Sequence, residues 1–240
     1  MNILINGASV STGEYSWPYL LQKNLNCNLV NLARPMCGAT YIHETTIAEL
    51  SERSYDLVLI MWADGINRID YKLSPDSIST YFLNKKYTSL EQTKNYDWPE
   101  KIIYPVNDQE VSQKDWVFGA GYLDPRSRDD VNAELFSGYY KFTSYKEQLF
   151  YTLIRIISLQ GVLKSMHVPY RFIFFTPLSG RSKFPKLFEL IDFEMVYNGD
   201  SLKTIAVENN WMEGGKFDTH PNELAQEMFA TQLTNYIQNL

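Results

Sequence analysis

Three residues of the chain have the types that nucleophilic catalysis on an ester requires: Ser9, Asp218 and His220. His220 lies in a loop just before the last expected helix, and Asp218 stands close enough in the chain to reach its imidazole ring. An imidazole oriented by a carboxylate can act as a general base, and it can activate a serine hydroxyl by taking its proton. These residue types predict acyl transfer through a serine, provided that the fold brings the two ends of the chain together.

Each of these residues also has a purely structural interpretation. Ser9 lies in a turn after a short apolar run, where a serine can cap a helix. Asp218 and His220 could form a capping pair at the start of the last helix. The other two histidines, His43 and His167, are interpreted as capping or surface residues. The case for a site therefore depends on the positions that the fold gives to Ser9 and His220.

The elements that would position these residues alternate between strand and helix. Short apolar runs predict strands at 2–6, 27–32, 55–62 and 170–176, with a further short strand at 193–197. Apolar residues at helical spacing predict helices at 17–25, 45–51, 140–167, 184–191 and 222–240. This alternation predicts an α/β domain of three layers, α/β/α and flavodoxin-like, with a central parallel sheet of about five strands. Ligands of such sheets bind beyond the carboxyl ends of the strands, so the loops after Asn6, Leu32 and Trp62 should share one rim.

The regular pattern stops after the third expected strand. Residues 64–138 contain scattered prolines, tryptophans and charged residues, with only short regular pieces among them. So long an irregular stretch inside a compact domain is usually a functional loop, a cap or a small subdomain. We interpret 64–138 as a cap-like insertion, with some local helix, in a single domain that spans 1–240.

Composition narrows the classes of partner. A chain of 240 residues that is 45% hydrophobic can bury one sizeable core, and its net charge of -6 weighs against nucleic acid and anionic membrane surfaces. No segment has the length of a membrane span or of a signal-peptide core, which predicts a cytoplasmic protein without membrane insertion. Cys27 and Cys37 favour buried free thiols, although a disulfide stays open. No motif for a metal or an organic cofactor is present, so no cofactor is expected.

The order of these motifs resembles that of the SGNH (GDSL-type) hydrolases, as a divergent branch. In that family a Gly-Asp-Ser block follows the first strand, a glycine follows the second, an asparagine loop follows the third, and an Asp and a His precede the last helix. Here Gly7-Ala8-Ser9 matches the first block with alanine in place of aspartate, Gly38 matches the second, and 218–221 match the last. The resemblance implies that the serine, aspartate and histidine form a catalytic triad on a fold of the SGNH type.

The third block departs from the family pattern. Asp64 stands where the family has its asparagine, and an ionised carboxylate cannot donate a hydrogen bond to an oxyanion. Asn67 is the alternative donor if the loop bulges. The resemblance then implies an oxyanion hole made by the N–H groups of Ser9 and Gly38 and the side chain of Asn67. Nearby residues of the same block are predicted to bind substrate: Trp62, Asp64 and Arg68.

The leading functional interpretation is a serine-dependent hydrolase of a small acyl ester. The many aromatic residues of the insertion favour an O-acetyl group on a carbohydrate as the substrate. O-acyl transfer onto a glycan stays open, because water and a sugar hydroxyl compete for the same acyl-enzyme. A non-catalytic glycan-binding or assembly protein also stays open, since Ala8 and Asp64 depart from the family pattern. The oligomeric state is not predicted.

Overall fold

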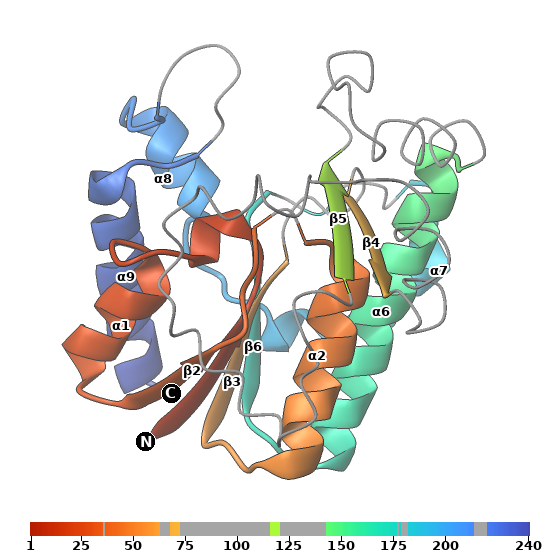
Figure 1. Cartoon of the computed structure of the whole chain (residues 1–240), viewed down its shortest axis with the longest axis horizontal. Coiled ribbons are helices and arrows are strands. Elements are labelled where there is room, and N and C mark those ends of the chain that lie inside the picture. The colour runs from red at the N-terminus through yellow and green to blue at the C-terminus, as the bar shows by residue number, and fades with distance from the viewer. Residues whose placement is uncertain are drawn as a thin grey trace, which may run out of the picture.

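A parallel sheet of four strands is the centre of the molecule in the computed structural model. The structure describes residues 1–35, 37–62, 68–72, 116–120, 143–176, 178, 182–213 and 220–240, and of 116–120 and most of 68–72 only the backbone. The strands of the sheet run in the order β2-β1-β3-β6 (Figure 1). Their bounds are Asn2–Asn6 for β1, Asn28–Asn31 for β2, Leu57–Trp62 for β3 and Tyr170–Phe174 for β6.

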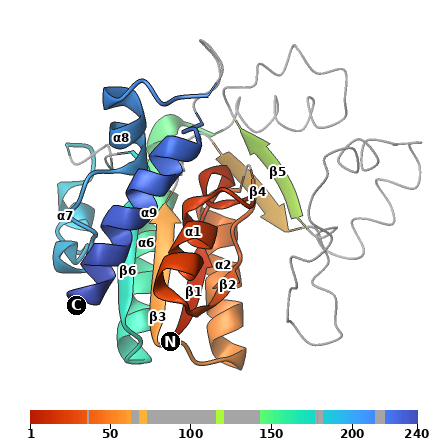
Figure 2. The same ribbon diagram turned by 90° about the vertical axis from the view of Figure 1, so that its left-hand side faces the viewer.

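Helices cover both faces of this sheet. On one face lie α1 (Trp17–Leu25), α8 (Leu202–Glu208) and α9 (Glu223–Gln238). On the other face lie α2 (Ala39–Glu52) and the long α6 (Tyr145–Ser165). The two layers stand to the left and right of the sheet in Figure 1, and the turned view of Figure 2 shows α1 and α9 side by side. This arrangement confirms the predicted three-layer α/β/α fold.

The sequence of β3 shows why both layers are needed. Leu57, Leu59 and Met61 pack toward the layer of α1, α8 and α9, whereas the residues between them pack toward α2 and α6. All six side chains of the strand are buried. A strand that is apolar on both sides is stable only where both faces of its sheet are covered, which is the usual setting of a parallel strand.

The carboxyl ends of the four strands lie at one edge of the sheet, because all the strand pairs are parallel. The loops that leave β1 and β2 therefore start from the same rim as the carboxyl end of β3, as the sequence predicts (Figure 1). On the remaining chain, α7 (Pro185–Phe188) follows β6, and the 3-10 helices η1 (Ser9–Ser11) and η6 (Phe193–Met195) are single turns. Of these elements, η1 follows β1 directly and lies on the rim.

Within the predicted insertion the structure describes two short strands. β4 (Arg68–Lys72) and β5 (Trp116–Ala120) pair antiparallel, with Arg68 opposite Ala120. The other residues of 64–138 lie outside the described part of the chain, and so does any helix within them. The cap-like role of the insertion stays a prediction.

Several predicted elements differ in extent from those observed. The expected fifth strand at 193–197 is the 3-10 turn η6 followed by a single parallel bridge between Val196 and Phe172. The Asp192 side chain accepts the Glu194 N–H and so favours the turn. Helix α2 begins at residue 39 and not at 45, because Gly38 already serves as its N-cap. Helix α8 was not predicted.

Two further observations concern the cysteines and whether any helix could span a membrane. Cys27 and Cys37 are both buried free thiols, which was the favoured interpretation. Among the helices of the described residues, none combines the length and the apolar character that crossing a lipid bilayer demands.

Candidate functional site

Ser9 lies on the rim of the sheet in a tightly packed turn. It opens η1, which the chain enters from β1 through Gly7 and Ala8. A Cβ atom at Gly7 would lie 2.7 Å from the Ser11 Oγ and 3.2 Å from the Met61 carbonyl oxygen, so this position has room only for glycine. The first N–H groups of a helix have no acceptor within it. Ser9 thus combines a partly exposed hydroxyl with a backbone N–H at the start of a helical turn.

Hydrogen bonds hold this turn from several directions. Within it, the Ser11 N–H donates to the Ala8 carbonyl at 2.9 Å. The Trp17 indole N–H donates to the fully buried Ser11 hydroxyl at 3.0 Å. Three side chains donate to the carbonyl groups of the turn: Thr12 to Ser9 at 2.7 Å, Asn31 to Ser11 at 2.8 Å and Gln226 to Val10 at 3.3 Å. The position of Ser9 is therefore set by contacts with α1, β2 and α9.

His220 meets Ser9 at this rim. Its Nε2 atom lies 2.9 Å from the Ser9 Oγ, although 211 positions separate the two residues in sequence. This distance lies within the range of a hydrogen bond between a nucleophile and its base. The structure thus brings together two of the residues that the sequence analysis selected.

A short antiparallel pairing holds the backbone around His220. The Glu213 N–H donates to the His220 carbonyl at 2.7 Å, and the Asn222 N–H donates to the Trp211 carbonyl at 2.8 Å. The Asn222 side chain then accepts the Ala225 N–H and caps α9. His220 is consequently held between the end of α8 and the start of α9. Asp218 lies outside the described residues, so its bond to His220 stays a prediction.

The loop that carries Gly38 is joined to the serine turn. The Gly7 carbonyl accepts the Arg34 N–H at 3.1 Å and the Cys37 thiol at 3.2 Å. Gly38 is the N-cap of α2, a helix of 14 residues, and the amino-terminal end of a helix favours negative charge. The segment after β2 therefore offers a backbone N–H and a favourable helix dipole near the turn of Ser9.

Buried polar groups surround this loop. Arg34 is 7% exposed, and burial lowers the pKa of its guanidinium, which nevertheless stays charged at neutral pH. The Tyr41 hydroxyl donates to the Leu32 carbonyl at 3.0 Å, and burial raises the pKa of that hydroxyl. The Tyr41 N–H donates to the Asp70 carboxylate at 2.6 Å, so β4 contacts the first turn of α2. These bonds fix the loop and the start of α2 in place.

The residues predicted from the third block have different outcomes. Trp62 is 2% exposed and packs edge-on against Phe172, with 5.7 Å between ring centroids, so its placement does not support the predicted contact with substrate. It continues the buried row of β3 that faces α2 and α6. Asp64 and Asn67 lie outside the described residues. Arg68 begins β4, and its side chain is not described.

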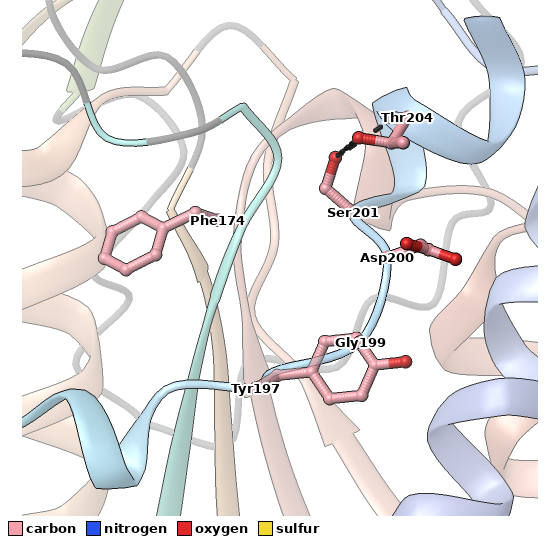
Figure 3. Close-up of a pocket in the computed structure, with 6 residues that line it drawn as sticks. All are labelled: Phe174, Tyr197, Gly199, Asp200, Ser201 and Thr204. Atoms are coloured by element: carbon pink, nitrogen blue, oxygen red, sulfur yellow. Dashed lines mark hydrogen bonds between the residues drawn. The ribbon is translucent and has the colours of Figure 1, made fainter. Parts of the chain in front are cut away.

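A pocket of about 260 Å³ lies elsewhere, between the end of β6 and the start of α8 (Figure 3). Its lining residues are Phe174, Tyr197, Gly199, Asp200, Ser201 and Thr204. The hydroxyls of Ser201 and Thr204 lie 2.8 Å apart, and Ser201 also accepts the Thr204 N–H as the N-cap of α8. None of the predicted site residues lines this pocket, and two of its polar groups serve to start a helix.

Among the described residues, no group of three or more His, Cys, Asp or Glu side chains could hold a metal ion.

Several residues that position the site are not predicted from the sequence. Asn31 and Gln226 bind the carbonyls of the serine turn, and Trp211 and Glu213 pair with the histidine segment. Gln226 lies 216 positions from its partner Val10. Local patterns of sequence hold no signal for contacts of this kind.

Comparison with known proteins finds similar folds among solved structures. No protein-family model matches the sequence, and no curated protein matches it. Among solved structures, the psychrotrophic esterase EstA from Pseudoalteromonas sp. is 14% identical with a TM-score of 0.51, over 99% of this chain and 97% of that one. The acetyl xylan esterase AlAXEase is 8% identical with a TM-score of 0.49, over 99% of this chain and 100% of its own. A member of the lipolytic G-D-S-L family from Veillonella parvula DSM 2008 is 12% identical with a TM-score of 0.44, over 100% of both chains. At such identities the likeness concerns the fold alone, and the chain shares a three-layer α/β fold with the esterase EstA.

Proposed function

We propose that the chain is a serine-dependent ester hydrolase of the SGNH kind, with Ser9 as nucleophile and His220 as general base. The observation that carries this proposal is the distance of 2.9 Å between the Ser9 Oγ and the His220 Nε2 at the carboxyl edge of a parallel sheet. Parallel sheets bind their ligands at that edge. The chain shares its fold with the esterase EstA, which agrees with the proposal at the level of the fold.

The proposed reaction has two steps. His220 takes the proton of the Ser9 hydroxyl while the oxygen attacks the acyl carbonyl, and it then gives that proton to the leaving alkoxide. Water hydrolyses the acyl-enzyme with His220 acting again as base. Asp218 is proposed to orient the imidazole and to stabilise its charged form.

Negative charge develops on the carbonyl oxygen during both steps. We assign its stabilisation to the N–H groups of Ser9 and Gly38, with Asn67 as a third donor. The positive end of the α2 dipole at Gly38 and the buried charge of Arg34 in the same loop favour an anion there. The proposed substrate is a small acyl ester, and the aromatic residues of the insertion support an O-acetyl group on a carbohydrate.

Turnover of p-nitrophenyl acetate by Ser9→Ala tests this function. We expect the substitution to abolish turnover, because it removes the nucleophile, and to prevent labelling by a fluorophosphonate probe. Ser158→Ala is the matched control, since Ser158 also contacts a histidine but lies on α6. Turnover that persists unchanged in Ser9→Ala would refute the assignment of Ser9.

The non-catalytic alternative rests on two departures from the family pattern, at Asp64, which lies outside the described residues, and at Ala8. This residue is fully buried beside Ser9, where the family has an aspartate. Absence of labelling in folded protein, together with binding of acetylated glycans, would favour a binding role over hydrolysis. Acylated glycans detected by mass spectrometry after incubation with an acyl donor would instead indicate transfer.

A further inference from the structure

Gln226 is a buried polar residue that joins the helix after His220 to the segment that carries Ser9. It lies in the first turn of α9, where its N–H donates to the carbonyl of the N-cap residue Asn222 at 3.1 Å. His220 lies two positions before the N-cap residue Asn222. Gln226 is only 7% exposed, so its side-chain amide must find partners inside the protein.

Both ends of the Gln226 amide are bound to the segment that carries Ser9. Its Nε2 donates to the Val10 carbonyl of η1 at 3.3 Å. Its Oε1 accepts the Trp17 N–H at the start of α1 at 3.0 Å. The Trp17 indole also binds the Ser11 hydroxyl, so the amide holds the serine turn directly and through Trp17.

From this geometry we infer that Gln226 is a positioning residue that sets the distance between Ser9 and His220. The inference rests on the proposed function for its catalytic meaning, because a positioned pair matters only if Ser9 is the nucleophile. One amide fixes the turn of the nucleophile to the helix that begins beside the base. A shift of the reacting groups by about 1 Å can lower the rate of a reaction about 100-fold.

A second buried glutamine supplies a matched control. Gln160 on α6 is also 7% exposed. Its Nε2 donates to the Leu190 carbonyl at 2.9 Å, and its Oε1 accepts the Asp192 N–H at 2.7 Å. It therefore makes the same pair of bonds as Gln226, but it joins α6 to the segment between α7 and η6. Loss of either amide leaves one N–H and one carbonyl without these partners. The bonds of Gln226 are buried and those of Gln160 are partly buried, so Q226M carries the larger penalty in stability.

The experiment compares wild type, Gln226→Met, Gln160→Met and Ser9→Ala. Methionine nearly preserves the length of glutamine and removes both bonds. Two quantities are measured: the rate at which a fluorophosphonate probe labels Ser9, and the nitrogen NMR resonance of the His220 ring. We expect Q226M to slow labelling by about 10- to 100-fold and to move the His220 resonance toward its position in S9A. We expect Q160M to change the labelling rate less than about twofold and to leave the resonance in place.

The inference is overturned if Q226M behaves like Q160M in both measurements. If wild type neither labels nor turns over an ester, the proposed function fails, and the His220 resonance alone still supports or overturns the positioning role. Gln226→Glu serves if Q226M does not fold, because it keeps an acceptor for the Trp17 N–H and loses only the donor to Val10. Its His220 resonance is then expected to move in the same direction as in S9A, and an unmoved resonance overturns the inference.

Discussion

The described residues contain two contacts between a serine and a histidine, and they are nearly equal in length. Ser9 and His220 lie 2.9 Å apart at the rim of the sheet, and Ser158 and His43 lie 3.0 Å apart between α6 and α2. Their surroundings differ. Ser158 and His43 lie within long helices, where backbone N–H groups are used in helical hydrogen bonds. Ser9 opens a helical turn whose first N–H groups have no acceptor within it.

A hydrogen bond between a serine and a histidine is therefore not by itself a candidate active site. An acyl-transfer site also needs N–H donors aimed at the developing oxyanion. The segments that carry Ser9 and Gly38 begin helices at the same rim, and the bonds to the Gly7 carbonyl join them. The backbone around Ser158 has no comparable position, so we expect that pair to do no more than join two helices.

The largest expected effect is the difference in kcat between substitutions of the two histidines. Substitution by glutamine keeps a polar atom near the position of Nε2 and removes the basic ring. His220→Gln should lower kcat for p-nitrophenyl acetate by about 1,000-fold, because general base catalysis typically contributes 100- to 10,000-fold. His43→Gln should leave kcat within about twofold of wild type. Steady-state kinetics of the two variants checks both statements, and an equal loss in both would erase the proposed difference.

A second, smaller difference lies in the packing around each serine. Gly7 precedes Ser9 and has no room for a methyl group, whereas a Cβ atom at Gly161, one turn after Ser158, would meet nothing within 4 Å. Gly7→Ala should destabilise the protein by about 1–3 kcal/mol and lower activity, because it displaces the buried Ser11. Gly161→Ala should stabilise it by about 0.5–1 kcal/mol, since alanine favours a helix interior. Urea unfolding with parallel assays measures both, and a tolerated alanine at position 7 would contradict the close packing.

The smallest expected effect concerns pH. Burial is the main cause that lowers the pKa of His43 below its ordinary value, and the charge of Arg155 lowers it further. The folded state therefore binds this proton less readily than the unfolded chain does. The contribution of neutral His43 to stability is complete above the ordinary pKa of 6.5 and is lost as the pH falls through the lowered value.

The unfolding free energies of wild type and His43→Gln between pH 7.5 and 4.5 test this sign. Wild type should lose more stability than the variant as the pH falls below about 6.5, because only wild type binds the additional proton on unfolding. Identical pH dependence in the two proteins would show that His43 does not contribute.

Much of the fold and part of the site follow from local patterns in the sequence. Trp17–Leu25 is a helix with the predicted bounds, and the apolar run ending at Trp62 is a strand buried on both faces. Ser9 and His220 were selected because a serine after a first strand and a histidine before a last helix meet at one rim of a parallel sheet. Periodicity and element order suffice for these statements because they depend on residues close together in sequence.

Tertiary structure determined what local patterns do not encode. The distance of 2.9 Å between Ser9 and His220, the amide of Gln226 and the burial of Trp62 all depend on partners far away in the chain. A strand residue at the rim can be a ligand contact or a core residue, and only the helix packed against it distinguishes the two. The sequence by itself determined which chemical groups are present and on which kind of element they lie. Packing between distant elements determined which of those groups meet, because burial of side chains from distant parts of the chain against each other supplies most of the free energy that fixes a tertiary fold.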